Sequence, residues 1–292
     1  MFVTALMSLL PVFTPTEQNY QFVALIENLI YYLAFAALPV YLLVRRTPGM
    51  WRSLRPYPIS LLGALSIVML ALIGVFFFTD LSALWSILLE ALGVKLNSSS
   101  LVVPVTAPGL TLCVLYVAVL PGICEEFLFR GAILPAFERF GTRHAVLASA
   151  ALFALLHGSL EGLPTHLLLG VILGTLVVCC NSIYAGLIFH TTYNAATIIL
   201  ISIANRSANA ASEAASMLST IGGMEGVVAL LVEMLLMGVM MLFTLKMFHM
   251  MARMRGIAFQ PRRREPLRVS EWALLAAVLL CVALLYAVNR LV

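Results

Sequence analysis

Long apolar runs separated by short polar segments dominate the sequence and predict membrane-spanning helices. We expect eight spans, at about residues 22–44, 59–78, 110–137, 145–160, 165–180, 183–204, 227–250 and 272–288. The runs lack the alternation of transmembrane strands, and about 20 apolar residues are enough to cross a bilayer as a helix. The pattern therefore predicts an all-α polytopic membrane protein with about eight transmembrane helices around an internal active site.

The segments between the runs suggest a division into three parts. Residues 1–107 comprise the first two helices and a long non-cytoplasmic connection, in which residues 81–92 are expected to form an interfacial helix carrying Trp85. Residues 108–204 form a core of helices three to six, and residues 205–292 hold the last two helices with a basic cytoplasmic loop. Gly170 and Gly174, four residues apart, predict a close helix–helix contact in the fifth span.

Composition and charge support this interpretation and set the topology. The chain is 62% hydrophobic and 10% charged, whereas soluble domains carry about 25% charged residues. Twelve arginines lie in the loops at residues 45–58, 138–144 and 251–270, against three basic residues (Lys95, Arg206 and Arg290) on the opposite side. We therefore expect the arginine-rich loops to be cytoplasmic and both termini to be non-cytoplasmic. The net charge of +4 is not a nucleic-acid signal. The arginine run at residues 262–264 could form an anionic-lipid or nucleic-acid patch, but we interpret it as a topology anchor and expect no nucleic-acid partner.

Charged residues interrupt the third apolar run at Glu125, Glu126 and Arg130. Such groups are costly within a bilayer, so they indicate partners or a function. Glu126 and Arg130 are four residues apart with the acid first, which favours an ion pair on one helix face. Glu125 then remains as the carboxylate available to take a proton.

Polar residues also occur in the fourth and sixth spans. His157 lies in the fourth, and His190 and Asn194 lie one helical turn apart in the sixth. At ~1.5 Å per residue, the distance from the cytoplasmic end of the helix is roughly 20 Å for Glu125, 18 Å for His157, 10 Å for His190 and 16 Å for Asn194. Because the depths are similar, we predict one buried polar pocket toward the cytoplasmic half of the membrane. His166 is expected only to anchor the outer end of the fifth span.

This set of side chains is suited to hydrolysis without a covalent nucleophile. A carboxylate with a histidine can deprotonate water, and a second histidine with an amide can stabilise an oxyanion. Glu and His side chains also ligate zinc, so a metal-dependent reaction at the same residues is the alternative. No HExxH motif supports that alternative.

Three motifs in a fixed order carry a resemblance to a known family. They are Glu125-Glu126-x-x-x-Arg130, Phe153-x-x-x-His157 and His190-x-x-x-Asn194, and the similarity covers about residues 110–200. Here the chain resembles the CAAX protease and bacteriocin-processing (Abi) family of glutamic-type intramembrane proteases. The resemblance implies that Glu125 with His157 activates water, that His190 and Asn194 form an oxyanion hole, and that Glu126 and Arg130 orient the site. It implies no cofactor.

We therefore expect an intramembrane endopeptidase acting on a membrane-associated or lipidated protein or peptide within the lipid bilayer. The family's best-known branch removes the last three residues of prenylated CAAX proteins. Two alternatives remain: a metal-dependent protease using the same residues, and a non-enzymatic transporter or peptide-immunity protein. The residues specify neither a substrate sequence nor an oligomeric state.

Overall fold

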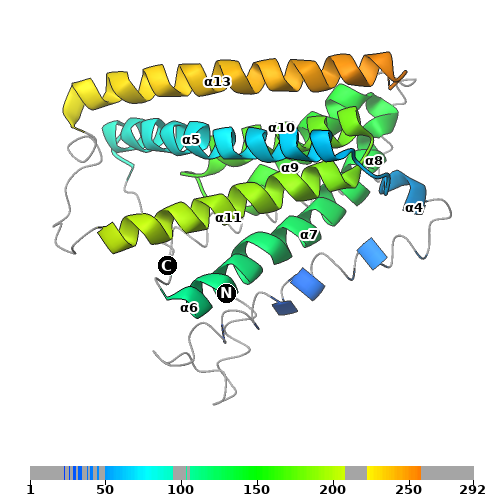
Figure 1. The fold of residues 1–292 in the computed structure, drawn as a ribbon, viewed down its shortest axis with the longest axis horizontal. Helices are drawn as coiled ribbons and strands as arrows, with labels where there is room; N and C mark the ends of the chain where they lie inside the picture. Colours follow the sequence, from blue (N-terminus) through cyan, green and yellow to red (C-terminus); the bar gives the residue numbers. More distant parts are fainter. Residues whose placement is uncertain are drawn as a thin grey trace. The chain divides into compact units, whose positions relative to one another are not determined.

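The computed structural model describes residues 50–94, 106–207 and 222–257, together with Val103 and part of the predicted first span. The described residues of that span are Val23, Ile26, Leu29, Ile30, Tyr32, Leu33, Ala34, Leu38, Val40, Tyr41 and Arg45. Three parts of the chain lie outside the described residues: the predicted eighth span, the arginine run at 262–264 and most of the polar loop at 205–225. Within the described part, all regular elements are helical (Figure 1).

The helices follow the predicted apolar runs. They are α4 Met50–Ser53, α5 Leu61–Ala91, α6 Ala107–Val114, η3 Leu115–Val119, α7 Leu120–Glu126, η4 Phe127–Ile133, α8 Leu134–Phe137, η5 Glu138–Phe140, α9 Thr142–Leu156, α10 Leu163–Cys180, α11 Ile183–Ser207 and α13 Gly223–Met254. Among the described residues, five helices are long and apolar enough to cross a membrane: Leu61–Ala91, Ala107–Phe140, Leu163–Cys180, Ile183–Ala204 and Gly223–Met254. The protein is therefore an integral membrane protein. The total of eight spans stays a prediction.

The second span is longer than predicted. Residues 81–92 do not form a separate interfacial helix, because α5 continues without a break from Leu61 to Ala91. No glycine or proline occurs between residues 75 and 91, so nothing in the backbone stops the helix at the polar residue Asp80. The chain leaves the helix next to Gly93, whose φ of 77° lies in the left-handed region that glycine tolerates.

Two prolines explain an irregular helix between Ala107 and Phe140. The π-helical segments η3 and η4 end just before Pro121 and Pro135. A proline lacks an N–H, and its ring clashes with the carbonyl four residues earlier, which favours a wider turn at that point. The helix is therefore distorted near Pro121 and Pro135, and Glu125 and Glu126 lie between the two wide turns.

Two compact units make up the structure, and each is described by itself. The first comprises residues 1–75, 98–132 and 180–215. In it, α11 packs along α6, η3 and α7, with an apolar cluster formed by Val103, Cys113, Tyr116, Ala118 and Ile198. The turns before α5 and α11 meet, because the Ile183 N–H donates to the Arg55 carbonyl at 3.0 Å and Ser182 Oγ donates to the Tyr57 carbonyl.

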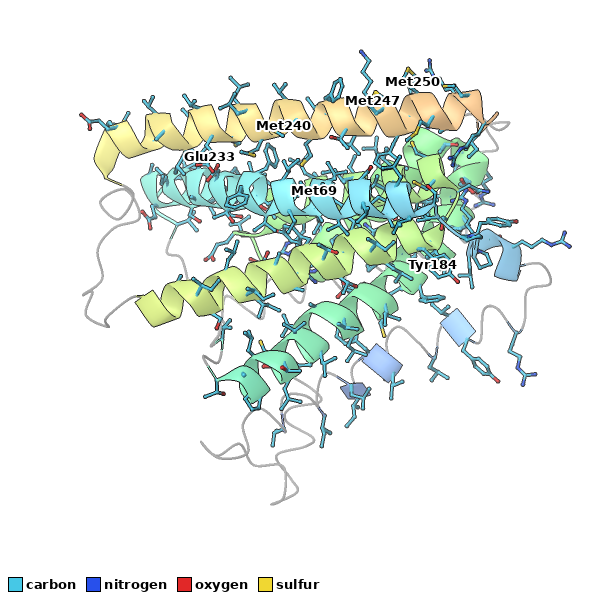
Figure 2. All side chains as sticks on the ribbon, viewed as in Figure 1. Met69, Tyr184, Glu233, Met240, Met247 and Met250 are labelled. Atoms are coloured by element: carbon cyan, nitrogen blue, oxygen red, sulfur yellow. The ribbon has the colours of Figure 1, made fainter. Side chains whose placement is uncertain are left out.

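The second unit comprises residues 76–97, 133–179 and 216–292. Its helices α9 and α10 approach closely at Gly170, where an added Cβ would lie 2.8 Å from the Ala150 Cα, and at Gly174 beside Val146. The predicted small-residue contact is thus confirmed. Helix α13 is largely exposed and presents Met240, Met247, Met250 and Glu233 (Figure 2).

Candidate active site

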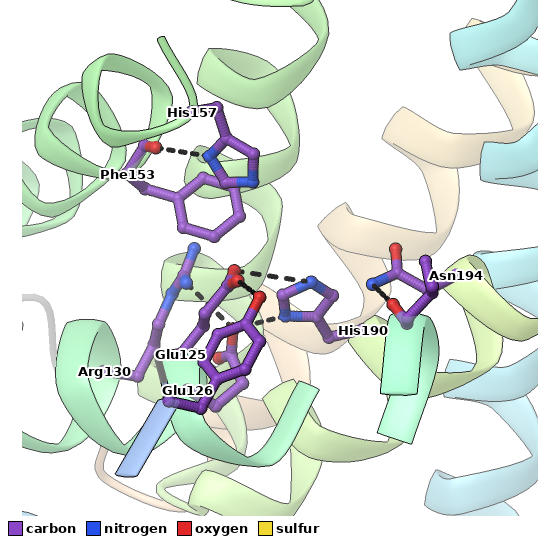
Figure 3. A network of polar contacts seen from close by, with 9 residues as sticks. Glu125, Glu126, Arg130, Phe153, His157, His190 and Asn194 are labelled. Carbon is purple, nitrogen blue, oxygen red and sulfur yellow. Dashed lines mark hydrogen bonds and ion pairs between the residues drawn. The ribbon is translucent and has the colours of Figure 1, made fainter. Parts of the chain in front are cut away.

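A buried ion pair on the helix of residues 107–140 is the centre of the first unit's polar network (Figure 3). Arg130 Nη1 donates to Glu126 Oε1 at 2.8 Å, and both side chains have 0% exposure. The predicted pair is therefore confirmed as a contact. Its burial is possible because the guanidinium and the carboxylate compensate each other's charge away from water.

The same carboxylate oxygen also contacts the sixth predicted span. His190 Nδ1 lies 3.0 Å from Glu126 Oε1, and the His190 side chain is only 3% exposed. Since Glu126 Oε1 accepts from Arg130, we assign His190 Nδ1–H as a second donor to the same oxygen. This orients the other ring nitrogen, Nε2, which lies 4.0 Å from Glu125 Oε2. The sequence predicted a shared depth for these residues, but not this contact.

Glu125 is held by a residue that sequence reasoning missed. Its side chain is 12% exposed, and its Oε1 accepts a hydrogen bond from Tyr32 Oη at 2.8 Å. Tyr32 belongs to the first predicted span, which carries no motif and no charged pattern. The only available signal was a tyrosine hydroxyl within an apolar run, because such a group requires a polar partner when buried.

Asn194 lies one turn beyond His190 on α11. Its Nδ2 is 3.4 Å from the carbonyl oxygen of Val117. Pro121 explains why that carbonyl is accessible, since a proline cannot donate the hydrogen bond that an α-helix would send back four residues. Asn194 therefore faces the wide turn that precedes the two glutamates.

Gly122 sets the distance between the two helices at this level. A Cβ on Gly122 would lie 2.5 Å from Thr191 Oγ1 and 3.3 Å from the Thr191 backbone nitrogen. Glycine thus allows α7 and α11 to approach closely beside His190. This approach brings the Glu126 carboxylate within hydrogen-bond distance of the histidine.

His157 lies in the second unit, directly after the last residue of α9. Its Nδ1 is 2.7 Å from the Phe153 carbonyl oxygen, and the two rings lie 4.6 Å apart. Because a carbonyl only accepts, Nδ1 carries the hydrogen in this contact. The side chain is exposed. Glu125 and His157 belong to different units, so their pairing stays a prediction.

A second histidine contacts His157. The rings of His157 and His166 are stacked, with centroids 3.9 Å apart and planes inclined by 20°. The sequence predicted only a membrane anchor for His166, because eight intervening residues and a turn hide the contact. Its position at the start of α10, across a short loop from α9, was the available signal.

The described residues of the first unit provide few side chains that could bind a metal ion. Glu125 Oε2 and His190 Nε2 lie 4.0 Å apart, and they are the two candidate ligands there. Among the described residues, no three His, Cys, Asp or Glu side chains form a group that could hold a metal ion. A third ligand from the predicted set would have to be His157.

The fold and the network define a helical membrane protein with a buried carboxylate–histidine site. Residues 107–196 match the family model described as type II CAAX prenyl endopeptidase Rce1-like. The match confirms the resemblance and supports a membrane-embedded, CAAX prenyl endopeptidase-like protease whose substrate is a membrane-associated protein. It includes every predicted site residue and excludes Tyr32. No match was found among curated proteins or among solved structures.

Proposed function

We propose that the protein is a glutamic-type intramembrane endopeptidase that hydrolyses a peptide bond of a membrane-associated or lipidated protein. The observation that carries the proposal is the placement of His190 beside Glu125 by the buried Glu126–Arg130 pair. Charged groups in a membrane span are retained for a function or a partner. Here Glu126 and Arg130 are partners of each other, and Glu125 is the carboxylate proposed to react.

In the proposed reaction, Glu125 together with His157 takes a proton from a water molecule. The resulting hydroxide attacks the scissile carbonyl carbon, and the carbonyl oxygen becomes an oxyanion. His190 Nε2–H and Asn194 Nδ2–H donate to that oxyanion. The proton held by the Glu125–His157 pair then passes to the leaving nitrogen, the C–N bond breaks, and a carboxylate and an amine are released.

The hydrogen bond to Glu126 imposes a condition on His190. With Nδ1–H donating to Glu126, Nε2 can donate to an oxyanion only when the ring carries both protons. The proposed role therefore requires both ring protons, with carboxylate oxygens 3.0 and 4.0 Å from the two ring nitrogens. The cluster is then electrically balanced, because two carboxylates face one guanidinium and one imidazolium, and this balance suits a site of low polarity.

Asn194 provides a donor that needs no protonation. Its amide has two hydrogens, and the contact at 3.4 Å directs one of them to Val117. The second is available to an oxyanion held between α7 and α11. The two donors are one turn apart on α11, which is compatible with one oxygen atom bound between them.

We further propose that the arginine-rich loops, including Arg52 and Arg55, are cytoplasmic and that the site opens from the cytoplasmic half. The hydrogen bonds that join the turns before α5 and α11 support one part of this topology. They require those two turns to lie on the same side of the membrane, as the eight-span arrangement predicts.

The test is a comparison of protein termini in membranes and medium from cells with wild type, a deletion and Glu125→Gln at matched abundance. We expect one or more new termini only with wild type, because the amide of Gln cannot accept the proton. Glu90→Gln is the matched control, since Glu90 is an exposed carboxylate on α5. If Glu125→Gln restores the wild-type termini to the deletion strain, the catalytic role of Glu125 is wrong. If wild type and the deletion give the same termini, the proteolytic function is wrong.

Two alternatives are separated by further arms of the same experiment. A metal-independent reaction continues after membranes are treated with a zinc chelator, whereas a metal-dependent reaction at the same residues stops and returns on adding zinc. A peptide-immunity or transport role persists in the Glu125→Gln variant without any new protein terminus.

A further inference from the structure

We propose that His166 is a positioning residue for His157 and holds its imidazole in the tautomer and orientation needed to accept a proton. The inference rests on the proposed function only for the catalytic role of His157. The geometry itself lies entirely within the second unit, in α9, α10 and the turn between them.

The His157 ring is held on two sides. Its Nδ1 edge is fixed by the Phe153 carbonyl at 2.7 Å, and one face is covered by the His166 ring at 3.9 Å. The Phe153 ring is tilted by 56° to His157 and by 65° to His166. These contacts leave Nε2 as the ring nitrogen that can receive a proton. Without the stacked ring, one hydrogen bond to the Phe153 carbonyl would have to hold this exposed side chain, and we expect the ring to leave that contact more often.

The structure also makes room for His166. A Cβ on Gly162 would overlap the His166 ring, reaching Cε1 and lying 2.6 Å from Nδ1. The turn that carries Gly162 is ordered by hydrogen bonds. The Gly162 N–H donates to Ser159 Oγ at 3.0 Å, and the His166 N–H donates to the Gly162 carbonyl at 2.8 Å. The close fit around one ring indicates that its position is specified.

A stacked imidazole is chemically suited to this role. When His157 takes a proton, its ring becomes a cation, and a neutral aromatic face next to it is attractive. Two protonated rings at 3.9 Å would repel each other. We therefore infer that the stacked pair holds at most one extra proton, which His157 receives through Nε2.

The first test needs no substrate. The purified full chain, labelled with ring-15N histidine, is placed in lipid nanodiscs, and the His157 signals are assigned by their loss in His157→Gln. We expect a protonated Nδ1 and an unprotonated Nε2 in wild type, an averaged tautomer in His166→Ala, and the wild-type pattern in His166→Phe. His144→Ala, at an exposed histidine on α9, is the control and should change nothing. An unchanged His157 spectrum in His166→Ala overturns the proposal.

The second test measures turnover of a farnesylated peptide that ends in three residues after the modified cysteine, or of the substrate found by the termini comparison. We expect His166→Ala and Gly162→Ala to lower kcat roughly ten- to a hundredfold at an unchanged KM, because a small misplacement of a reacting group is costly. His166→Phe should restore most of the rate. If His166→Phe is as slow as His166→Ala, stacking is not the cause and the proposal is wrong.

The two tests separate the inference from the function on which it rests. Failure of wild type to cleave any substrate contradicts the protease, while the nitrogen spectra still decide whether His166 controls the His157 ring. A cleaving wild type whose His166→Ala variant has normal spectra and normal kcat contradicts only the positioning role.

Discussion

Glu126 Oε1 lies 3.0 Å from His190 Nδ1, although 64 residues separate the two in the chain. The same oxygen accepts from Arg130. One carboxylate therefore ties the helix of residues 107–140 to α11 and also sets the direction of the His190 ring. Substitutions around this oxygen should affect stability and activity differently.

Arg130→Ala should lower the abundance and thermal stability of the protein. Removing the guanidinium leaves Glu126 as a buried charge with one fewer partner, and breaking such a pair typically costs about 3–5 kcal/mol. The measurement is the fraction of monodisperse protein after heating in detergent. The double variant Glu126→Gln/Arg130→Met should recover part of the loss, because no unpaired charge remains. Normal abundance and full activity of Arg130→Ala would show that the pair has no structural role.

Tyr32→Phe should reduce kcat and lower stability by the contribution of one hydrogen bond. The variant keeps the ring and removes one hydrogen bond to Glu125, and a hydrogen bond to a charged group is worth about 1.5–3 kcal/mol. A loss of at least tenfold in kcat is expected, measured on the substrate used for wild type. Tyr184→Phe, at a largely exposed tyrosine on α11, is the matched control. A faster Tyr32→Phe enzyme would mean instead that the phenol restrains Glu125.

Asn194→Ala should leave a folded protein with a kcat reduced by about a hundredfold or more, the usual effect of losing one oxyanion donor. KM should change little, because the donor acts mainly on the transition state. Thr197→Val removes a hydroxyl from the next turn of α11, where it donates to the Tyr193 carbonyl, and should retain turnover. Full turnover by Asn194→Ala would exclude the proposed oxyanion role.

Gly122→Ala should impair both stability and activity, because the added methyl group would meet Thr191 Oγ1 at 2.5 Å. Forcing extra atoms into a packed interface typically costs about 1–3 kcal/mol. Adding Thr191→Ala removes the hydroxyl oxygen and should restore part of the loss. The measurements are detergent thermal stability and turnover. If the single variant matches wild type in both, close approach of α7 and α11 is not required.

The parts of the fold that depend on local sequence were predictable. The apolar runs located the five long helices, and the four-residue spacing indicated the Glu126–Arg130 pair, because both properties repeat along a single helix. The contacts from Glu126 to His190 and from Tyr32 to Glu125 depend on how separate helices rotate against each other. No spacing in the chain encodes that rotation.

The wrong boundary in α5 has a similar cause. Asp80 and Trp85 indicated an interface, yet Asp80 is buried, and Trp85 donates its Nε1–H to the Leu160 carbonyl at 2.9 Å. A tertiary contact thus satisfies the Trp85 indole N–H, which sequence reasoning assigned to the membrane surface. The stacking of His157 and His166 was missed for the same reason, since the turn between α9 and α10 determines it.

Helix α9 is short for a membrane span. Its 15 residues extend about 22 Å, less than the ~30 Å thickness of a bilayer's hydrocarbon core. The 32 residues of α13 extend about 48 Å, which exceeds the same thickness. A lipid bilayer adapts to a short helix by thinning beside it, and thinning beside α9 shortens the path from the cytoplasmic surface to His157. For the proposed hydrolysis, we therefore expect acyl-chain length to affect the access of water to His157.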